Sequence, residues 1–307
     1  MQTILISGGT GLIGKTLVPF LTEQGYRVIV LTRSLEGKHA SEVISYAEWN
    51  VEKMVIDVAA VQKADYIIHL AGAGVVDKKW TASYKKQIVE SRTQSSKLLV
   101  DTLRNNKHEV KAIISASAIG WYGEDRVAGK AFTEEDASAP GFLGETCKLW
   151  EESITAAEVL NIRVCKIRTG IVLDTKGGAL AEFIKPINFG VAGILGDGKQ
   201  IVSWIHIMDH CRIFLHAIQH NEMTGSYNAV APNPVSNKEL TIAIAEAKKG
   251  SFYVPMHVPT FVLKLMLGER STEILKSTTV SATKLKATGF TFIYPSIKGA
   301  IENLVSE

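Results

Sequence analysis

The 307-residue sequence has little cysteine and no marked excess of charge of one sign. Its three cysteines, Cys147, Cys165 and Cys211, lack the close pairing of a zinc site or redox motif, so we expect free thiols in a reducing compartment and no metal. Lysine and arginine total 34 against 31 acidic residues, and the excess of +3 is spread along the chain. This pattern favours neither a nucleic-acid partner nor a membrane partner.

Long hydrophobic runs are also absent. No apolar stretch approaches the ~18 residues of a membrane span. Residues 1–3 lead directly into an apolar strand without a charged leader, which predicts a cytoplasmic protein. With 46% hydrophobic residues, the chain can bury the core of one large domain or two modest ones.

Apolar β-rich runs alternate with stretches of helical periodicity. The runs predict strands at 3–7, 27–31, 66–70, 112–115 and 163–168. Apolar spacing predicts helices at 15–24, 81–105, 144–160 and 210–220. This alternation is typical of an α/β protein with a doubly wound parallel sheet, a Rossmann domain.

The pattern changes after about residue 232. Prolines there punctuate shorter predicted helices at 260–267 and 296–305. We therefore predict a Rossmann domain at 1–232 and a smaller α/β subdomain at 233–307. The smaller part would form the second wall of a substrate cleft, because such sheets bind ligands outside the carboxyl ends of their strands.

A glycine motif lies between the first strand and the first helix. Residues 8–14 read GGTGLIG, with Gly8, Gly11 and Gly14 at the spacing of a dinucleotide-binding turn. Gly8 allows the tight turn, Gly11 allows the backbone to approach a pyrophosphate, and Gly14 allows close helix packing. The helix N-terminus would face the negative charge.

The end of the second strand bears on which dinucleotide binds. An acidic residue there would accept a hydrogen bond from the ribose 2′-hydroxyl and would repel a 2′-phosphate. This chain has Thr32-Arg33-Ser34 instead. Arg33 can bind a phosphate through its planar guanidinium, and Ser34 can donate a further hydrogen bond. NADP(H) is therefore favoured over NAD(H), although a solvated surface role for Arg33 is the alternative.

Other segments of the chain add to the evidence from the glycine motif. Residues 69–72 (HLAG) close one predicted strand and residues 115–117 (SAS) close another. With the glycines, they resemble the extended short-chain dehydrogenase/reductase superfamily of NAD-dependent epimerases and dehydratases. Segments 121–123 (WYG), 204–206 (WIH) and 267–269 (LGE) are similar to an epimerase-like subfamily that includes cell-division-inhibitor homologues and carries a C-terminal domain of unknown function. The resemblance covers nearly the whole chain.

The resemblance implies a catalytic serine, tyrosine and lysine. Ser117 matches the serine and Lys148 the lysine, but the tyrosine position falls on Gly144. A glycine cannot transfer a proton, so the ordinary site is incomplete. Tyr122, in the loop after Ser117, is a provisional replacement acid, with a packing or structural role as the alternative. Lys148 would hold the ribose and Ser117 would orient the substrate.

Arg92 matches a position where the extended family carries an asparagine that faces the site. Its guanidinium could hold a cofactor phosphate, a substrate anion or an ordered water, or it could form an ion pair with Glu90 or another carboxylate. The residues expected to contact the cofactor are Gly8, Thr10, Gly11, Leu12, Ile13, Gly14, Thr32, Arg33, Ser34, Leu70, Ala71, Gly72 and Arg92.

These features predict an NADP(H)-binding epimerase or reductase that acts on a small carbonyl or hydroxyl compound, with a nucleotide sugar among the candidates. The missing tyrosine favours one alternative, a non-catalytic redox sensor that reports through a partner. The other is a regulatory factor in which the dinucleotide only stabilises the fold. A homodimer is left open.

Overall fold

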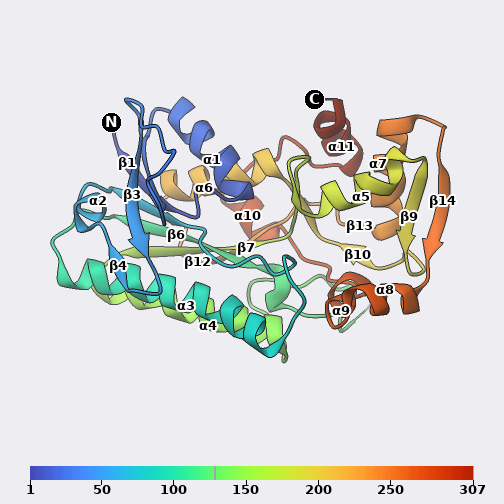
Figure 1. The fold of residues 1–307 in the computed structure, drawn as a ribbon, viewed down its shortest axis with the longest axis horizontal. Coiled ribbons are helices and arrows are strands. Elements are labelled where there is room, and N and C mark those ends of the chain that lie inside the picture. The colour runs from blue at the N-terminus through green and yellow to red at the C-terminus, as the bar shows by residue number, and fades with distance from the viewer. Residues whose placement is uncertain (128, 307) are drawn as a thin grey trace.

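A parallel sheet forms the centre of the computed structural model, which describes residues 1–127 and 129–306 (Figure 1). Its strand order is β12 (Gly225–Ala229), β7 (Arg163–Thr169), β6 (Ala112–Ala118), β5 (Tyr66–His69), β1 (Thr3–Ser7), β2 (Arg27–Thr32), β3 (Ile44–Asn50) and β4 (Val55–Ile56). Only β4 runs antiparallel to its neighbour. The predicted α/β class and the doubly wound parallel sheet are confirmed.

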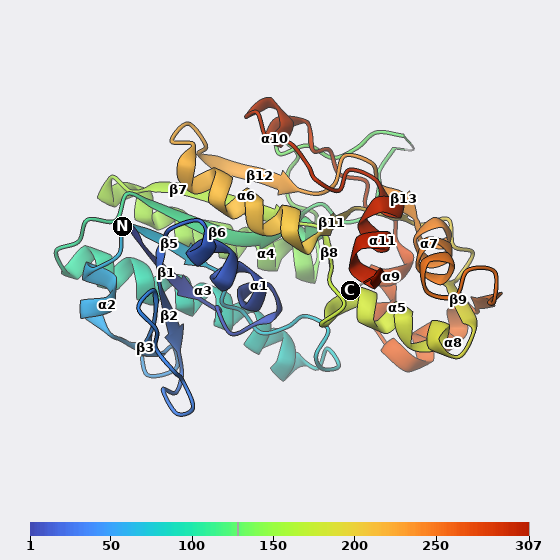
Figure 2. The same ribbon diagram turned by 90° about the horizontal axis from the view of Figure 1, so that it is seen from above.

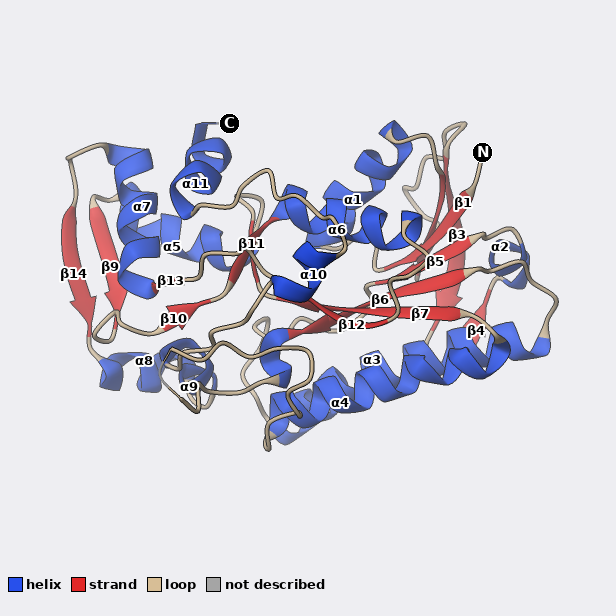
Figure 3. Ribbon diagram, turned by 180° about the vertical axis from the view of Figure 1, so that it is seen from behind, coloured by secondary structure: helices blue, strands red, loops and turns tan. Residues whose placement is uncertain are grey.

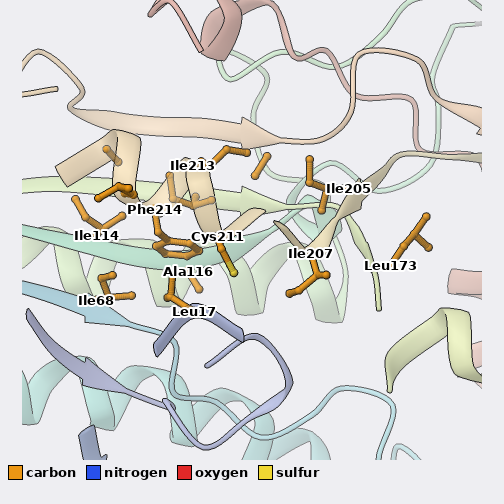
Figure 4. Close-up of a cluster of buried hydrophobic side chains, with 14 of the residues drawn as sticks. Leu17, Ile68, Ile114, Ala116, Leu173, Ile205, Ile207, Cys211, Ile213 and Phe214 are labelled. Atoms are coloured by element: carbon orange, nitrogen blue, oxygen red, sulfur yellow. The ribbon is translucent and has the colours of Figure 1, made fainter. Parts of the chain in front are cut away.

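Helices cover both faces of the sheet. In Figure 2, α1 (Leu12–Glu23) and α6 (Ile207–Gln219) lie on one face, with α3 (Ala82–Asn105) and α4 (Phe142–Thr155) on the other. Alternate residues of β1 serve the two cores, because Ile4 and Ile6 join the α1/α6 side and Leu5 joins the α3 side. In Figure 4 the side chains of Leu17, Ile114 and Phe214 belong to one buried cluster on this face.

Two chain segments build a second, smaller layer at one end of the sheet (Figure 3). The first comprises β8 (Ile171–Leu173), α5 (Gly178–Asn188), β9 (Val191–Leu195), β10 (Ile201–Val202) and β11 (Trp204–His206). The second comprises β13 (Val235–Ser236), α7 (Asn237–Lys249), β14 (Val254–Val258), α8 (Thr260–Leu267), α9 (Arg270–Leu275) and α11 (Ile297–Ser306). Because β9 pairs with β14 and β10 with β13, the predicted boundary at residue 232 cuts through this layer.

The remaining elements are short. They are α2 (Val58–Gln62), α10 (Thr283–Ala287) and two 3-10 segments, η1 (Ile119–Trp121) and η2 (Ala156–Leu160). All predicted strands and helices are present. The strand at 3–7 and the helix at 260–267 have the predicted ends, and the ends of the others are shifted. For example, the helix predicted from residue 81 begins at Ala82, and the Thr81 side chain caps it by accepting a hydrogen bond from the Tyr84 N–H. No helix within the described ranges is long and apolar enough to cross a membrane.

Candidate functional site

The glycine loop joins β1 to the N-terminus of α1 at the carboxyl edge of the sheet. Gly8 has φ +74°, and a Cβ there would lie 2.9 Å from the Leu70 carbonyl carbon. At Gly14 a Cβ would lie 2.5 Å from the Gly8 carbonyl oxygen. Gly11 is the N-cap of α1, and no side chain caps the helix. Only glycines allow this close backbone cradle, and the uncapped N–H groups suit a dinucleotide pyrophosphate.

The end of β2 presents the residues predicted to choose the dinucleotide. The Thr32 hydroxyl is buried and donates to the Ser34 carbonyl at 2.9 Å, which shapes the turn. The Arg33 side chain is exposed, and none of the residues in the described ranges forms an ion pair with it. Its guanidinium is therefore free to meet an anion at this edge.

A buried histidine lies under the loop that follows β5. His69 Nδ1 is 2.6 Å from Ser7 Oγ, and Nε2 is 3.2 Å from both Ser95 Oγ and Ser96 Oγ. Burial, with a smaller effect of the Arg92 charge, lowers its pKa to about 3. The neutral imidazole therefore ties β1 and α3 to β5, and it positions the backbone at Leu70 without taking part in proton transfer near neutral pH.

Arg92 lies on α3, is nine-tenths buried, and contacts the same loop after β5. Its Nη1 donates to the carbonyls of Ala73, at 3.0 Å, and Ile88, at 2.9 Å, and its guanidinium stacks 4.8 Å from the Trp150 ring centre. A Cβ on Gly72 would lie 3.0 Å from Arg92 Cζ.

No carboxylate pairs with Arg92 within residues 1–127 and 129–306, and Glu90 pairs with Lys86 instead. The alternative of an ion pair between Arg92 and Glu90 is therefore wrong. Burial lowers the pKa of Arg92, but a guanidinium remains protonated at physiological pH. A buried cation held only by carbonyls and a ring is suited to an anionic or carbonyl-bearing ligand.

The second layer reaches the glycine loop through the start of α5. A Cβ added at Gly177 or at Gly178 would lie 3.2 Å from the Leu12 side chain. Gly177 is the N-cap of α5, again without a side-chain cap. The N-termini of α1 and α5 therefore meet at Leu12, so the smaller layer borders the candidate cofactor site.

A buried polar network lies at the carboxyl ends of β6 and β7. Glu151 forms a two-pronged ion pair with Arg168, with Nε to Oε1 at 2.8 Å and Nη2 to Oε2 at 3.0 Å. Ser117 donates to Glu151 Oε1 at 2.6 Å, and Ser226 donates to Oε2 at 3.0 Å. The two oxygens of Glu151 therefore accept four hydrogen bonds from side chains of this protein, two each, which satisfies the carboxylate.

Tyr122 closes the other side of the network. Its hydroxyl donates to Asn228 Oδ1 at 2.5 Å and accepts from Arg168 Nη1 at 3.0 Å. The side chain is fully buried, and burial raises its pKa to about 12, against the opposing effect of Arg168. The geometry does not support Tyr122 as the provisional acid, because its hydroxyl has no route to a substrate and holds its proton at neutral pH.

The structure does not bring Lys148 to Ser117. Lys148 lies on the exposed face of α4 and pairs with Glu152 at 3.9 Å, whereas Cys147 and Glu151 face inward. Ser117 is itself only 3% exposed. The ribose-holding role predicted for Lys148 therefore has no support in this geometry.

Gly144 has a steric explanation. A Cβ there would overlap the Ala139 carbonyl oxygen, so the helix approaches the preceding loop too closely for any side chain.

Sequence reasoning did not find Glu151 or Arg168. Both were visible as charges inside apolar segments, Glu151 on the apolar face of a predicted helix and Arg168 at the end of a buried strand. Charged residues are almost never fully buried unless paired, and that rule could have suggested each of them. It could not have identified them as partners, because they lie on different elements.

Comparison with known proteins agrees with this architecture. The NAD dependent epimerase/dehydratase family matches residues 4–230, and a domain of unknown function, DUF1731, matches residues 258–304. The chain therefore belongs to the NAD dependent epimerase/dehydratase family. It is 36% identical to an epimerase family protein of Staphylococcus saprophyticus, over 99% of this chain and 100% of that protein. It is 33% identical to the epimerase family protein YfhF of Bacillus subtilis, over 100% and 99%.

Solved structures share the fold. A human epimerase family protein, SDR39U1, determined with NADPH, superposes with a TM-score of 0.86 at 23% identity and 99% coverage of both chains. A nucleoside-diphosphate sugar epimerase from Corynebacterium glutamicum has a TM-score of 0.77 at 32% identity, and the match covers 100% of this chain but 59% of that one.

Breaking the buried ion pair should destabilise the protein strongly. We expect Arg168→Met to lower the free energy of unfolding by about 3–5 kcal/mol, because Glu151 is left buried and uncompensated. The double variant Arg168→Met/Glu151→Leu should lose less than the sum of the two single variants. Chemical denaturation measures all three. Lys148→Met, at the exposed pair, is the control and should change stability by less than about 1 kcal/mol. Additive losses would contradict a coupled pair.

Two buried histidines should make the fold sensitive to acid. Burial lowers the pKa of His210, like that of His69, to about 3 from 6.5. Between these pH values the unfolded chain binds protons that the folded chain does not. The free energy of unfolding should therefore fall as pH falls, by up to ~1.4 kcal/mol per pH unit for each histidine.

His210→Gln should remove its share of this slope, while His39→Gln, at an exposed side chain, should leave the slope unchanged. Denaturation at a series of pH values tests this. Equal slopes in the native chain and His210→Gln would refute the assignment.

Proposed function

We propose that the chain binds NADP(H) along the carboxyl edge of its central sheet and acts as an epimerase- or reductase-like protein on a small carbonyl or hydroxyl compound. The observation that carries the proposal is the glycine cradle under the N-terminus of α1, which has no side-chain cap, with the exposed Arg33 at the end of the next strand. NADPH in the human structural relative supports the same choice of dinucleotide.

The residues present fit a dinucleotide. Gly8, Gly11 and Gly14 leave the backbone open to a pyrophosphate, and Thr10, Leu12 and Ile13 belong to the same turn. Arg33 and Ser34 would hold the 2′-phosphate beside Thr32. The backbone from Leu70 through Ala71 to Gly72 would form the floor beneath the nicotinamide half. When bound, the nicotinamide gives or accepts a hydride.

Arg92 is the cation that we assign to this site in place of Lys148. It lies against Gly72 and Ala73, whereas Lys148 is exposed and paired with Glu152. A guanidinium there would hold a ribose hydroxyl or polarise a substrate oxygen. Ser117 would act only indirectly, by fixing Glu151 and thereby the loop after β6.

A second candidate function is a non-catalytic NADP(H) sensor. One observation favours it: both hydroxyls expected to serve the reaction, Ser117 and Tyr122, are engaged in the buried network. A sensor needs the dinucleotide site but no proton donor near the nicotinamide. Nucleotide-sugar epimerases among the structural relatives favour the enzyme and name a substrate class to test first.

The dinucleotide preference rests on Arg33. Arg33→Ala should weaken NADPH binding by about tenfold or more, because a charge-assisted contact to the 2′-phosphate is lost, and should leave NADH binding unchanged. Fluorescence or calorimetric titration of both dinucleotides measures this. Arg27→Ala, at the opposite end of β2, is the matched control. If NADPH and NADH bind with equal affinity, and Arg33→Ala changes neither affinity, the NADP(H) assignment is contradicted.

Turnover separates the enzyme from the sensor. A panel of carbonyl compounds and nucleotide sugars is incubated with NADPH or NADP⁺, and cofactor absorbance and product are followed. The enzyme proposal expects turnover that falls about tenfold or more in Arg92→Met and is partly restored in Arg92→Lys, because the charge returns. Tight NADPH binding without turnover of any compound would favour the sensor.

A further inference from the structure

The end of the molecule farthest from the central sheet carries an unusual number of exposed apolar side chains. Figures 1 and 2 place β9 and α8 at this end. We name its exposed large residues the apolar strip: Phe189, Phe252, Val254, Met256, Phe261, Leu265 and Met266. Phe189 is 87% exposed, Phe252 84% and Leu265 83%, so these side chains protrude from the surface. Exposed apolar groups gathered in this way mark an interaction surface.

Two of the aromatic side chains lie at neighbouring turns. Phe189 precedes Gly190, which has φ +80°, and Phe252 follows a turn at Gly250, with φ +59°. The two turns are held side by side, because the Val254 N–H donates to the Gly190 carbonyl at 2.8 Å. Both phenylalanines therefore lie mostly exposed at the tips of turns, and apolar side chains exposed in this way can insert into a lipid interface.

Helix α8 continues the strip directly after β14. Its eight residues, TFVLKLML, are apolar apart from Thr260 and Lys264, yet only Leu263 is buried. Phe261 and Leu265 lie four residues apart and therefore share one outer face. A helix that is apolar on nearly all sides normally has its faces covered, whereas the described residues leave the outer face of α8 exposed.

Lysines flank the strip at both ends. Lys248 and Lys249 end α7 just before Phe252, whose N–H donates to the Lys249 carbonyl at 3.0 Å, and Lys264 lies within α8. In the described part of the chain none of these three lysines forms an ion pair. The exposed acids near them include Glu246 and Glu269, and Glu269 is paired with Lys85. The charge around the strip is therefore complementary to an anionic surface.

A second copy of the chain fits this surface less well. The outward-facing backbone of β14 includes Pro255, which has no N–H to donate, so strand addition at this edge is blocked. A twofold contact through the strip would also bring the lysines of both copies together, which costs free energy.

We propose that the apolar strip is a peripheral docking surface for an anionic lipid membrane. Phe252, Phe261 and Leu265 would enter the interfacial region, while Lys248, Lys249 and Lys264 would contact acidic headgroups. The contact is reversible and requires no spanning segment. It departs from the expectation of no membrane partner, which rested on the spread of charge along the whole sequence and on the absence of a long apolar run.

Vesicle co-sedimentation with the full chain tests the proposal. We expect binding to phosphatidylcholine vesicles that contain phosphatidylglycerol, little binding to pure phosphatidylcholine, and weaker binding as ionic strength rises. Leu265→Glu should lower the partition coefficient about tenfold or more. The variant replaces an apolar side chain that would enter the lipid with a negative charge that anionic lipid repels. Lys248→Glu should lower it less.

Val159→Glu is the matched control, since Val159 is 74% exposed on the 3-10 segment after α4, outside the strip. It should bind vesicles as the native chain does, and thermal unfolding should confirm that both variants fold. Absent vesicle binding, or equal loss in Leu265→Glu and Val159→Glu, would overturn the proposal. So would a dimer in light scattering that Leu265→Glu dissociates without any vesicle binding, because the strip would then join two copies.

Discussion

The ion pair between Glu151 and Arg168 holds together the part of the protein on which the site depends. It joins α4 to β7, and through Ser117, Tyr122 and Ser226 it reaches β6, the loop after β6 and β12. Desolvating two charges is costly, and that cost is met only when every oxygen and nitrogen has a partner. Here the carboxylate oxygens accept from arginine and two serines, so the network stabilises one arrangement of these loops over others.

This arrangement explains why the site differs from the one that the resemblance implies. Ser117 and Tyr122 are turned into the network, Gly144 lets α4 pack on the Ala139 carbonyl, and Lys148 faces solvent. Arg92 places a buried positive charge beside the candidate site, where two backbone carbonyls and the ring of Trp150 hold it. Catalysis by this chain would depend on positioning and on a fixed positive charge, because its buried phenol and imidazole do not titrate near neutral pH.

The smaller layer has two faces of different character. Its inner side brings Gly177 and Gly178 against Leu12, at the edge of the candidate dinucleotide site. Its outer end exposes Phe252 and Leu265 among lysines. A layer built from two separated chain segments can link these faces, because β9 from the first segment pairs with β14 from the second.

Local sequence was sufficient to predict five of the eight strands of the central sheet and the glycine turn before α1. The central strands, the glycine turn and the residues after β2 are specified by neighbours in the chain, since backbone conformation and side-chain periodicity act over a few residues. The short strands of the second layer were missed, because β8 to β11 gain their order from pairing with distant segments.

The motifs shared with the family predicted the fold correctly, but they did not predict in which direction the side chains on α3 and α4 point. Whether Lys148 or Arg92 faces the site depends on how α3 and α4 are rotated against the sheet, and a shift of one residue on a helix turns a side chain by about 100°. The sequence by itself determined a doubly wound α/β protein with a dinucleotide turn. Only the tertiary structure decided which charges are buried together and which gather on the surface, because those energies depend on distances between residues far apart in the chain.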